Sequence, residues 1–271
     1  MKEQTMVTTA PMSERAVQWG RAWGSRAKDW ELSELQQLPT YEEAIRRAEI
    51  SAGQRVLEVG CGTGVFLRAA ADVGAEVYGL DASEALLELA RARVPEADLR
   101  LGDLESLPYE DDCFDVVAGF NSFFFALDLV RALREAGRVA KPGAPVVIQV
   151  WGRHERCDLE AMKAVARPFM PPRPPDAPPE PDLAAAGLLE GLAAEAGLEP
   201  QSAFDLTWAY EFADEDELGQ AMLAPMGLGD LAGPAREDEV RRQIVDALAP
   251  CRTPHGGYRL ENEFRVVIAS A

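Results

Sequence analysis

The chain has 271 residues and a formal net charge of −19 at neutral pH, because 27 lysines and arginines face 46 aspartates and glutamates. Its length and its hydrophobic content of 47% are typical of a folded globular chain with a well-buried core. An acidic chain lacks the basic side chains that bind nucleic acid or an anionic membrane surface. We therefore expect neither as a partner, and we expect a small-molecule substrate.

The cysteines and histidines form no metal-binding pattern. The four cysteines contain no CxxC pair, and the two histidines, His154 and His255, lie far apart. The first 12 residues lack the basic start and apolar core of a signal peptide. The most apolar stretch, 114–130, is too short for a membrane span and contains two aspartates. These features predict a reduced, cytoplasmic protein without a metal site.

The segment 54–150 alternates short apolar runs with amphipathic stretches, which predicts parallel strands joined by helices. Strands are expected at 55–59, 75–80, 98–101, 114–119 and 144–150, and helices at 65–73, 84–93 and 127–138. Ser83 is expected to cap the second of these helices.

The second half is less regular. Eight prolines fall within 168–181, which excludes a helix or a central strand and leaves a stiff linker or a lid. A helix is expected at 183–196, an acidic helical stretch at 214–249, and strands at 204–212 and 263–269.

A glycine loop with the spacing G-x-G-x-G, Gly60 to Gly64, follows the first strand and opens a helix. Glycines there let the backbone approach a ligand closely. Val65 stands where a dinucleotide-binding fingerprint has its third glycine. Glu58, just before the loop, favours a ligand with an ammonium or sulfonium group over a pyrophosphate.

Two more acids follow the next two strands. Asp81 can accept both hydroxyls of a ribose, or it can help Ser83 to cap the following helix. Asp103 can accept a hydrogen bond from an adenine amino group, and Leu104 can cover the ring. Because open α/β sheets bind ligands at the carboxyl ends of their strands, the acids together predict a nucleoside-binding edge.

These segments resemble class I S-adenosylmethionine-dependent methyltransferases (EC 2.1.1.-) of the small-molecule group. The matching stretches are VLEVGCGTG (56–64), GLDAS (79–83), GDLESLPYEDDCFDVV (102–117) and KPGAPVVI (141–148). The resemblance is specific over 55–150, about a third of the chain. It implies an α/β fold with a Rossmann-like, doubly wound sheet of seven strands, the last of them antiparallel.

The resemblance also implies that the cofactor is S-adenosyl-L-methionine and the product S-adenosyl-L-homocysteine. The glycine loop would hold the methionine part of the cofactor, and Glu58 would bind its amino end. Asp81 would bind the ribose and Asp103 the adenine. The loop after the fourth strand would lie beside the sulfonium. The expected cofactor-binding residues are therefore Glu58, Gly60, Cys61, Gly62, Gly64, Asp81, Ala82, Asp103, Leu104, Phe120 and Asn121.

The N-terminal region is rich in tryptophan, with three of the five tryptophans, Trp19, Trp23 and Trp30, between 19 and 30. Their spacing puts them on one face of a helix. This helix either packs on the edge of the core or forms a lid over the cofactor. In a lid, Arg26 would pair with the methionine carboxylate, and indole rings would face the sulfonium.

The segments 151–182 and 213–262 are long for this family, in which a tight hairpin joins strands six and seven. We interpret them as a helical cap over the methyl group, or as the interface of a homodimer. Trp19, Trp23, Phe124 and Trp151 are expected to line an apolar substrate pocket. If the acceptor is a hydroxyl, His154 is the first candidate for a base and His255 the second, although a lone histidine is more often structural.

The predicted organisation is one catalytic domain in four parts: a helical lid (1–50), a cofactor-binding core (51–152), a proline-rich insertion with a helix (153–202), and strands six and seven with the cap (203–271). The predicted function is methyl transfer to a small, partly apolar metabolite by in-line displacement, driven mainly by positioning. One alternative is a cofactor-binding protein without turnover. A nicotinamide-dependent oxidoreductase is another, disfavoured by Glu58 and Val65.

Overall fold

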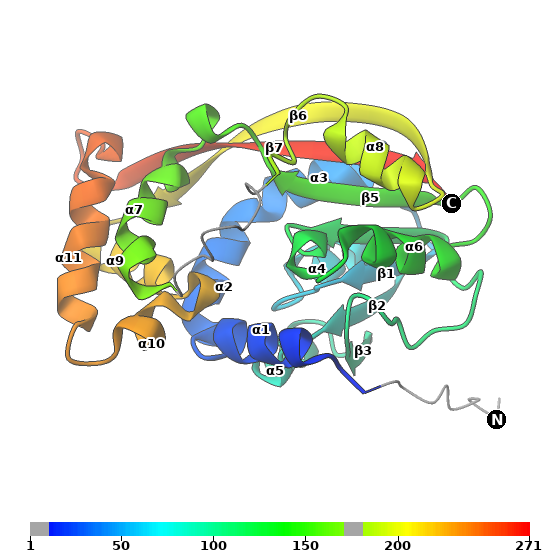
Figure 1. Ribbon diagram of the computed structural model, residues 1–271, viewed down its shortest axis with the longest axis horizontal. Coiled ribbons are helices and arrows are strands. Elements are labelled where there is room, and N and C mark those ends of the chain that lie inside the picture. Colours follow the sequence, from blue (N-terminus) through cyan, green and yellow to red (C-terminus); the bar gives the residue numbers. More distant parts are fainter. Residues whose placement is uncertain (1–10, 171–180) are drawn as a thin grey trace, which may run out of the picture.

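The computed structural model describes residues 11–170 and 181–271. Its centre is a seven-stranded sheet in the order β3-β2-β1-β4-β5-β7-β6 (Figure 1). The strands are β1 (Arg55–Val59), β2 (Glu76–Asp81), β3 (Asp98–Leu101), β4 (Val116–Phe120), β5 (Pro145–Trp151), β6 (Glu199–Phe212) and β7 (Tyr258–Ser270). Strand β7 runs antiparallel to both neighbours, β5 and β6, which confirms the predicted fold class.

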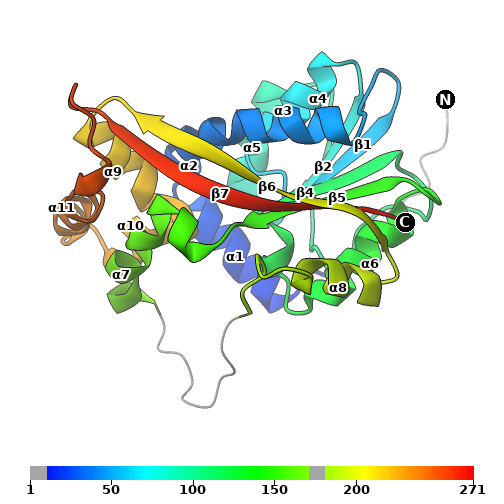
Figure 2. The same cartoon turned by 90° about the horizontal axis from the view of Figure 1, so that it is seen from above.

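The helices cover both faces of the sheet. They are α1 (Glu14–Gly24), α2 (Ala27–Glu34), α3 (Leu38–Arg47), α4 (Val65–Asp72), α5 (Glu84–Arg93), α6 (Leu129–Val139), α7 (Met162–Ala166), α8 (Leu188–Glu195), α9 (Glu215–Leu223), α10 (Leu228–Ala232) and α11 (Glu237–Ala247). Helices α3, α4 and α5 lie on one face and α6 and α8 on the other (Figure 2). Seven 3-10 turns connect them within the described residues, η1 (Leu35–Gln37) and η2 (Phe123–Phe125) among them.

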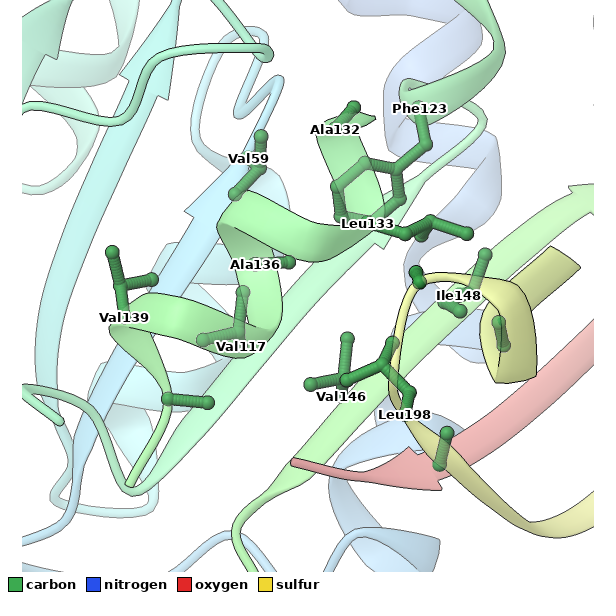
Figure 3. Close-up of a cluster of buried hydrophobic side chains, with 14 of the residues drawn as sticks. Val59, Val117, Phe123, Ala132, Leu133, Ala136, Val139, Val146, Ile148 and Leu198 are labelled. Atoms are coloured by element: carbon green, nitrogen blue, oxygen red, sulfur yellow. The ribbon is translucent and has the colours of Figure 1, made fainter. Parts of the chain in front are cut away.

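The central strands are apolar because helices bury them on both faces. Figure 3 shows the side of α6, where Leu133 and Ala136 pack against Val117 of β4 and Val146 of β5. On the opposite face, Tyr41 of α3 belongs to a second fully packed cluster. Together these two clusters fix the sheet and therefore the positions of its strand ends.

A third hydrophobic cluster lies beyond the sheet. Strands β6 and β7 are 14 and 13 residues long and extend past their neighbours toward α9 and α11 (Figure 2). The helices inserted between these two strands pack with α7 and with the long ends of β6 and β7. The insertion predicted between strands six and seven is therefore helical, as expected.

Several boundaries differ from the prediction. The helix expected at 183–196 begins at Leu188, because Gly187 has a left-handed backbone (φ 81°). The stretch 214–249 forms three helices, with breaks at Pro225 and Gly233. Residues 171–180 lie outside the described residues, so the choice between linker and lid stays a prediction. No helix within 11–170 and 181–271 has the length and hydropathy needed to cross a membrane.

Candidate functional site

The glycine loop lies at the carboxyl end of β1, where the sequence predicted it. Gly60, Gly62 and Gly64 all have left-handed backbones, with φ of 79°, 51° and 80°. A Cβ atom on Gly60 would lie 2.4 Å from the Cβ of Ser122, and one on Gly62 would lie 2.8 Å from the carboxylate of Glu34. Both the conformation and the crowding therefore require glycine.

The loop is tied to β2 by its own backbone. The amides of Gly60 and Cys61 donate to the carbonyl of Leu80, at 2.7 and 3.0 Å. The side chain of Cys61 is buried against Gly79, so Cys61 can offer only backbone atoms to a ligand.

Asp81 fixes the other side of the loop. Its Oδ2 accepts from the Gly62 amide at 2.9 Å, and its Oδ1 accepts from the Ser83 amide at 2.8 Å. Burial raises the pKa of Asp81 to about 6, although these hydrogen bonds oppose the rise. The side chain of Ser83 caps α5 through the amide of Leu86, which confirms the predicted cap. Each oxygen of Asp81 retains a lone pair for a ligand.

Glu58 is the least satisfied of the acids. Its side chain is 2% exposed, and its Oε2 has no hydrogen-bond partner within the described residues. Burial, with the charges of Glu34 and Asp81, raises the pKa of Glu58 well above its usual value. A buried carboxylate without a partner is costly, so this position fits a ligand that brings a positive charge.

Asp103 stands at the end of β3. Its Oδ1 accepts from the amide of Glu105 and its Oδ2 from the amide of Ser13, both at 3.0 Å. Burial opposes the ionised form, but these hydrogen bonds keep the pKa of Asp103 below its usual value. Leu104 beside it is partly buried against the core. The N-terminal segment thus reaches the end of the third strand.

Helices α1 and α2 lie along this same edge. Gly20 is so close to Ala82 that a Cβ atom would lie 2.0 Å from the Ala82 carbonyl oxygen. At the end of α2, Glu34 accepts from the amide of Thr63 in the glycine loop at 2.9 Å. Glu34 is buried, which raises its pKa to about 7. Glu34 is not among the predicted site residues, because nothing near it in the sequence distinguishes it from a solvated acid.

The tryptophans pack with the loop after β4. The ring centroid of Trp19 lies 4.8 Å and that of Trp23 5.6 Å from Phe125, and Phe125 also contacts Phe124 at 4.6 Å. Trp30 contacts Trp23 at 4.7 Å, but from α2 rather than α1. The predicted single helical face for the three tryptophans is therefore wrong, since the first helix ends at Gly24.

Arg26 and His154 have other partners than those expected. The guanidinium of Arg26 pairs with Asp29 at 3.1 Å, with Asp230 at 3.6 Å and with Glu237. The side chain of His154 is 55% exposed and its Nδ1 lies 2.9 Å from the Glu160 carboxylate. We therefore do not assign Arg26 a contact with the methionine carboxylate, and we do not assign His154 a catalytic role. His255 is also exposed.

The loop after β4 continues the edge. Phe120 is buried in an aromatic cluster with Tyr41 and Phe66, each ring centroid 4.7 Å away. Asn121 has a left-handed backbone (φ 51°), a strained state that asparagine tolerates better than most residues. Its Nδ2 donates to the Oε1 of Gln37 in η1 at 3.1 Å.

The far end of the edge is aromatic and polar. Trp151 of β5 has its ring centroid 5.0 Å from Phe264 of β7 and 6.4 Å from Tyr210 of β6. Gln149 precedes Trp151 on the same face of β5 and is 1% exposed. Gln149 is not among the predicted site residues, although a glutamine within the apolar run VVIQV was a usable signal.

Comparisons with known proteins agree with this geometry. The methyltransferase domain family matches residues 57–148. A probable S-adenosylmethionine-dependent methyltransferase of Mycolicibacterium smegmatis is 39% identical over 108 residues, 40% of this chain and 42% of that protein. An uncharacterized protein of Mycobacterium bovis is 31% identical over 219 residues, 76% of this chain and 78% of the other.

The crystal structure of the (4+2)-cyclase SpnF has a TM-score of 0.64 at 20% identity and covers 97% of both chains. This likeness shows the shared fold. The chain spans about two fifths of the length of the Mycolicibacterium relative. The part that matches the methyltransferase domain family, 57–148, contains the glycine loop and the acids Glu58, Asp81 and Asp103. The chain belongs to the class I S-adenosylmethionine-dependent methyltransferases, and S-adenosylmethionine is its cofactor.

Proposed function

We propose that this chain transfers a methyl group from S-adenosylmethionine to a small, partly apolar metabolite. The observation that carries the proposal is the row of acids at three successive strand ends, with the Oε2 of Glu58 buried and without a partner among the described residues. When bound, the cofactor supplies a methyl group already activated by a positively charged sulfur. The chain then has only to bind, orient and exclude water.

Each residue of the edge has a role in this proposal. Glu58 accepts from the ammonium of the methionine part, which the backbone of the glycine loop holds. Asp81 accepts from the ribose hydroxyls with its remaining lone pairs. Asp103 accepts from the adenine amino group, with Leu104 and Ala82 against the ring.

The remaining cofactor contacts and the acceptor pocket lie farther along the edge. Phe120 and Asn121 stand beside the sulfonium. The acceptor lies between the N-terminal helices and the cap, against the aromatic rings proposed to line its pocket, Trp19, Trp23, Phe124 and Trp151. We propose that the lid (1–50), the core (51–152), the insertion (153–202) and the cap-bearing part (203–271) form one catalytic domain. Formation of a homodimer stays a prediction.

One alternative retains a specific support. SpnF, whose fold this chain shares, is named a cyclase, so a protein of this shape can serve a reaction other than methyl transfer. A cofactor-binding protein without methyl transfer is therefore the second candidate. The nicotinamide-dependent oxidoreductase is dropped, because the chain belongs to a methyltransferase family.

Two measurements test the proposal. Calorimetry with S-adenosylhomocysteine and, separately, with NADH measures which cofactor binds. Incubation with methyl-labelled cofactor and a metabolite extract, followed by mass spectrometry, shows whether label reaches a small molecule. Transfer of label supports the proposal, and binding without transfer supports the second candidate. If S-adenosylhomocysteine does not bind, both are wrong.

A further inference from the structure

Three side chains near the ends of β4, β5 and β6 have buried polar atoms that lack hydrogen-bond partners among the described residues. They are both amide atoms of Gln149, the hydroxyl of Tyr210 and the Oδ1 of Asn121. Gln149 and Tyr210 are only 1% and 2% exposed. Buried polar groups in folded proteins are nearly always satisfied, so several unsatisfied groups on one face of the sheet indicate a ligand.

The sheet brings these groups to one face. Along β5 the side chains alternate, so Gln149 lies on the same face as Trp151, between Phe120 of β4 and Val266 of β7. The backbone amide of Asn121 donates to the backbone carbonyl of Gln149 at 2.9 Å, which puts the two residues side by side. Tyr210 reaches the same face from β6, with its ring 6.4 Å from Trp151.

The orientation of Asn121 is fixed by the N-terminal region. The side-chain Nδ2 of Asn121 donates to the Oε1 of Gln37 in η1, so the side-chain Oδ1 is left to accept from a ligand. Gln37 is the last residue of η1, which directly follows helix α2, so the N-terminal segment that packs on the strand ends also orients this acceptor atom.

The charges around these groups select against an anion. Glu34 and Glu58 are buried carboxyl groups with raised pKa values, so they offer a carboxylate or phosphate ligand no positive charge with which to pair. In the proposed function Glu58 already binds the ammonium of the cofactor. The groups left for the second ligand are therefore the side-chain amides of Asn121 and Gln149 and the phenol of Tyr210. Burial, with the charges of Cys157 and Glu34, raises the pKa of Tyr210, so its hydroxyl stays neutral and can donate.

We propose that Gln149, Tyr210 and the Oδ1 of Asn121 bind the methyl acceptor and select one that carries an uncharged hydroxyl on an aromatic or apolar frame. This inference rests on the proposed function. Asn121 accepts from the ligand hydroxyl, Tyr210 donates, and the amide of Gln149 can do either. Trp151 and Phe264 supply the flat apolar wall for the frame.

The first test uses three probes that share one frame and differ in charge: 1-naphthol, 1-naphthoate and 1-naphthylmethylamine. Each is titrated by ligand-observed NMR into protein saturated with S-adenosylhomocysteine. Wild type is expected to bind 1-naphthol roughly tenfold more tightly than the two charged probes. Gln149→Leu and Tyr210→Phe are each expected to weaken 1-naphthol binding about tenfold and to leave the Kd of S-adenosylhomocysteine within about twofold.

A second readout does not depend on the choice of probe. Among the described residues, the side chains of Gln149 and Tyr210 have no hydrogen-bond partner to lose, so Gln149→Leu and Tyr210→Phe should leave the Tm unchanged or raise it. Asn262 is the matched control, a fully buried amide that accepts from Leu159 and donates to Leu260, both at 3.2 Å. Asn262→Leu is expected to lower the Tm by about 2 to 4 °C or more.

The inference is overturned if a charged probe binds as tightly as 1-naphthol, if none of the three binds, or if both variants lose as much Tm as Asn262→Leu. These outcomes differ from those that contradict the proposed function. If the proposed function is wrong, wild type does not bind S-adenosylhomocysteine, or it binds the cofactor without transferring a methyl group.

Discussion

Replacing Glu34 by glutamine is expected to stabilise the fold at pH 8 and to change its stability little at pH 5. Glu34 is 4% exposed and accepts from the Thr63 amide at 2.9 Å. Burial raises its pKa from 4.5 to about 7, with the charge of Asp81 adding to the rise and the Thr63 hydrogen bonds and Arg93 opposing it. The carboxyl group is therefore neutral in the folded chain under conditions in which it is ionised in the unfolded chain.

The sign and size of the effect follow from proton linkage. Between pH 4.5 and pH 7 the folded state holds a proton on Glu34 that the unfolded state has released, so the free energy of unfolding falls as the pH rises. A shift from 4.5 to about 7, at about 1.36 kcal/mol per unit, corresponds to about 3 kcal/mol. This stability is fully present below pH 4.5 and lost above pH 7. Glutamine keeps an oxygen for Thr63 but cannot ionise.

The assay is urea unfolding followed by circular dichroism at pH 5, 6, 7 and 8, without cofactor. Glu31→Gln is the matched control, because Glu31 lies one turn earlier on α2, is 35% exposed and pairs with Arg93. The stability gained by Glu34→Gln should grow from pH 5 to pH 8 and the effect of Glu31→Gln should not. An equal gain at all four pH values would show that ionisation of Glu34 is not the cause.

Three further changes test other contacts. Asp81→Ala should weaken binding of S-adenosylhomocysteine by more than about tenfold in calorimetry, and an unchanged Kd would remove the ribose assignment. Arg26→Ala should leave that Kd within about twofold but lower the free energy of unfolding by roughly 1–2 kcal/mol, because three carboxylates lose their partner. A large loss of affinity would instead restore its predicted cofactor role. Gly20→Ala should speed hydrogen exchange in α1 and α2, because its Cβ would lie 2.0 Å from the Ala82 carbonyl oxygen. Gly191→Ala in α8 is its control and should be neutral or stabilising, because an added Cβ would have no atom of the described residues outside its own helix within 4 Å.

The parts of the site that could be predicted from the sequence have signals within a few residues. The Gly60 loop, the acid Asp81 and the cap Ser83 each follow the end of an apolar run, and the strand ends of a parallel sheet meet at one edge. Their predicted positions therefore needed no knowledge of which helix lies above them. For the same reason the strands from β1 to β5 were predicted to within two residues at each end.

The parts that could not be predicted depend on partners far away in the chain. Arg26 was expected to face the cofactor, but Asp230 and Glu237 lie more than 200 positions later and reach it only through the fold of the cap. Glu34 meets Thr63 by the packing of α2 on the glycine loop, which periodicity in the sequence does not encode. His154 follows β5 as predicted, yet the direction of the chain after Trp151 leaves it at the surface.

The two proposed binding regions draw on different parts of the chain. The residues proposed to bind the cofactor, Glu58 to Asn121, are close together in sequence and fall within the part that matches the methyltransferase family, 57–148. The proposed acceptor end takes Tyr210 and Phe264 from the long strands β6 and β7, whose extended ends pack on the inserted helices. If the acceptor binds there, changes in that insertion can reshape the proposed pocket without disturbing Glu58 or Asp81. A shared cofactor is then compatible with different acceptors in relatives that match only the core.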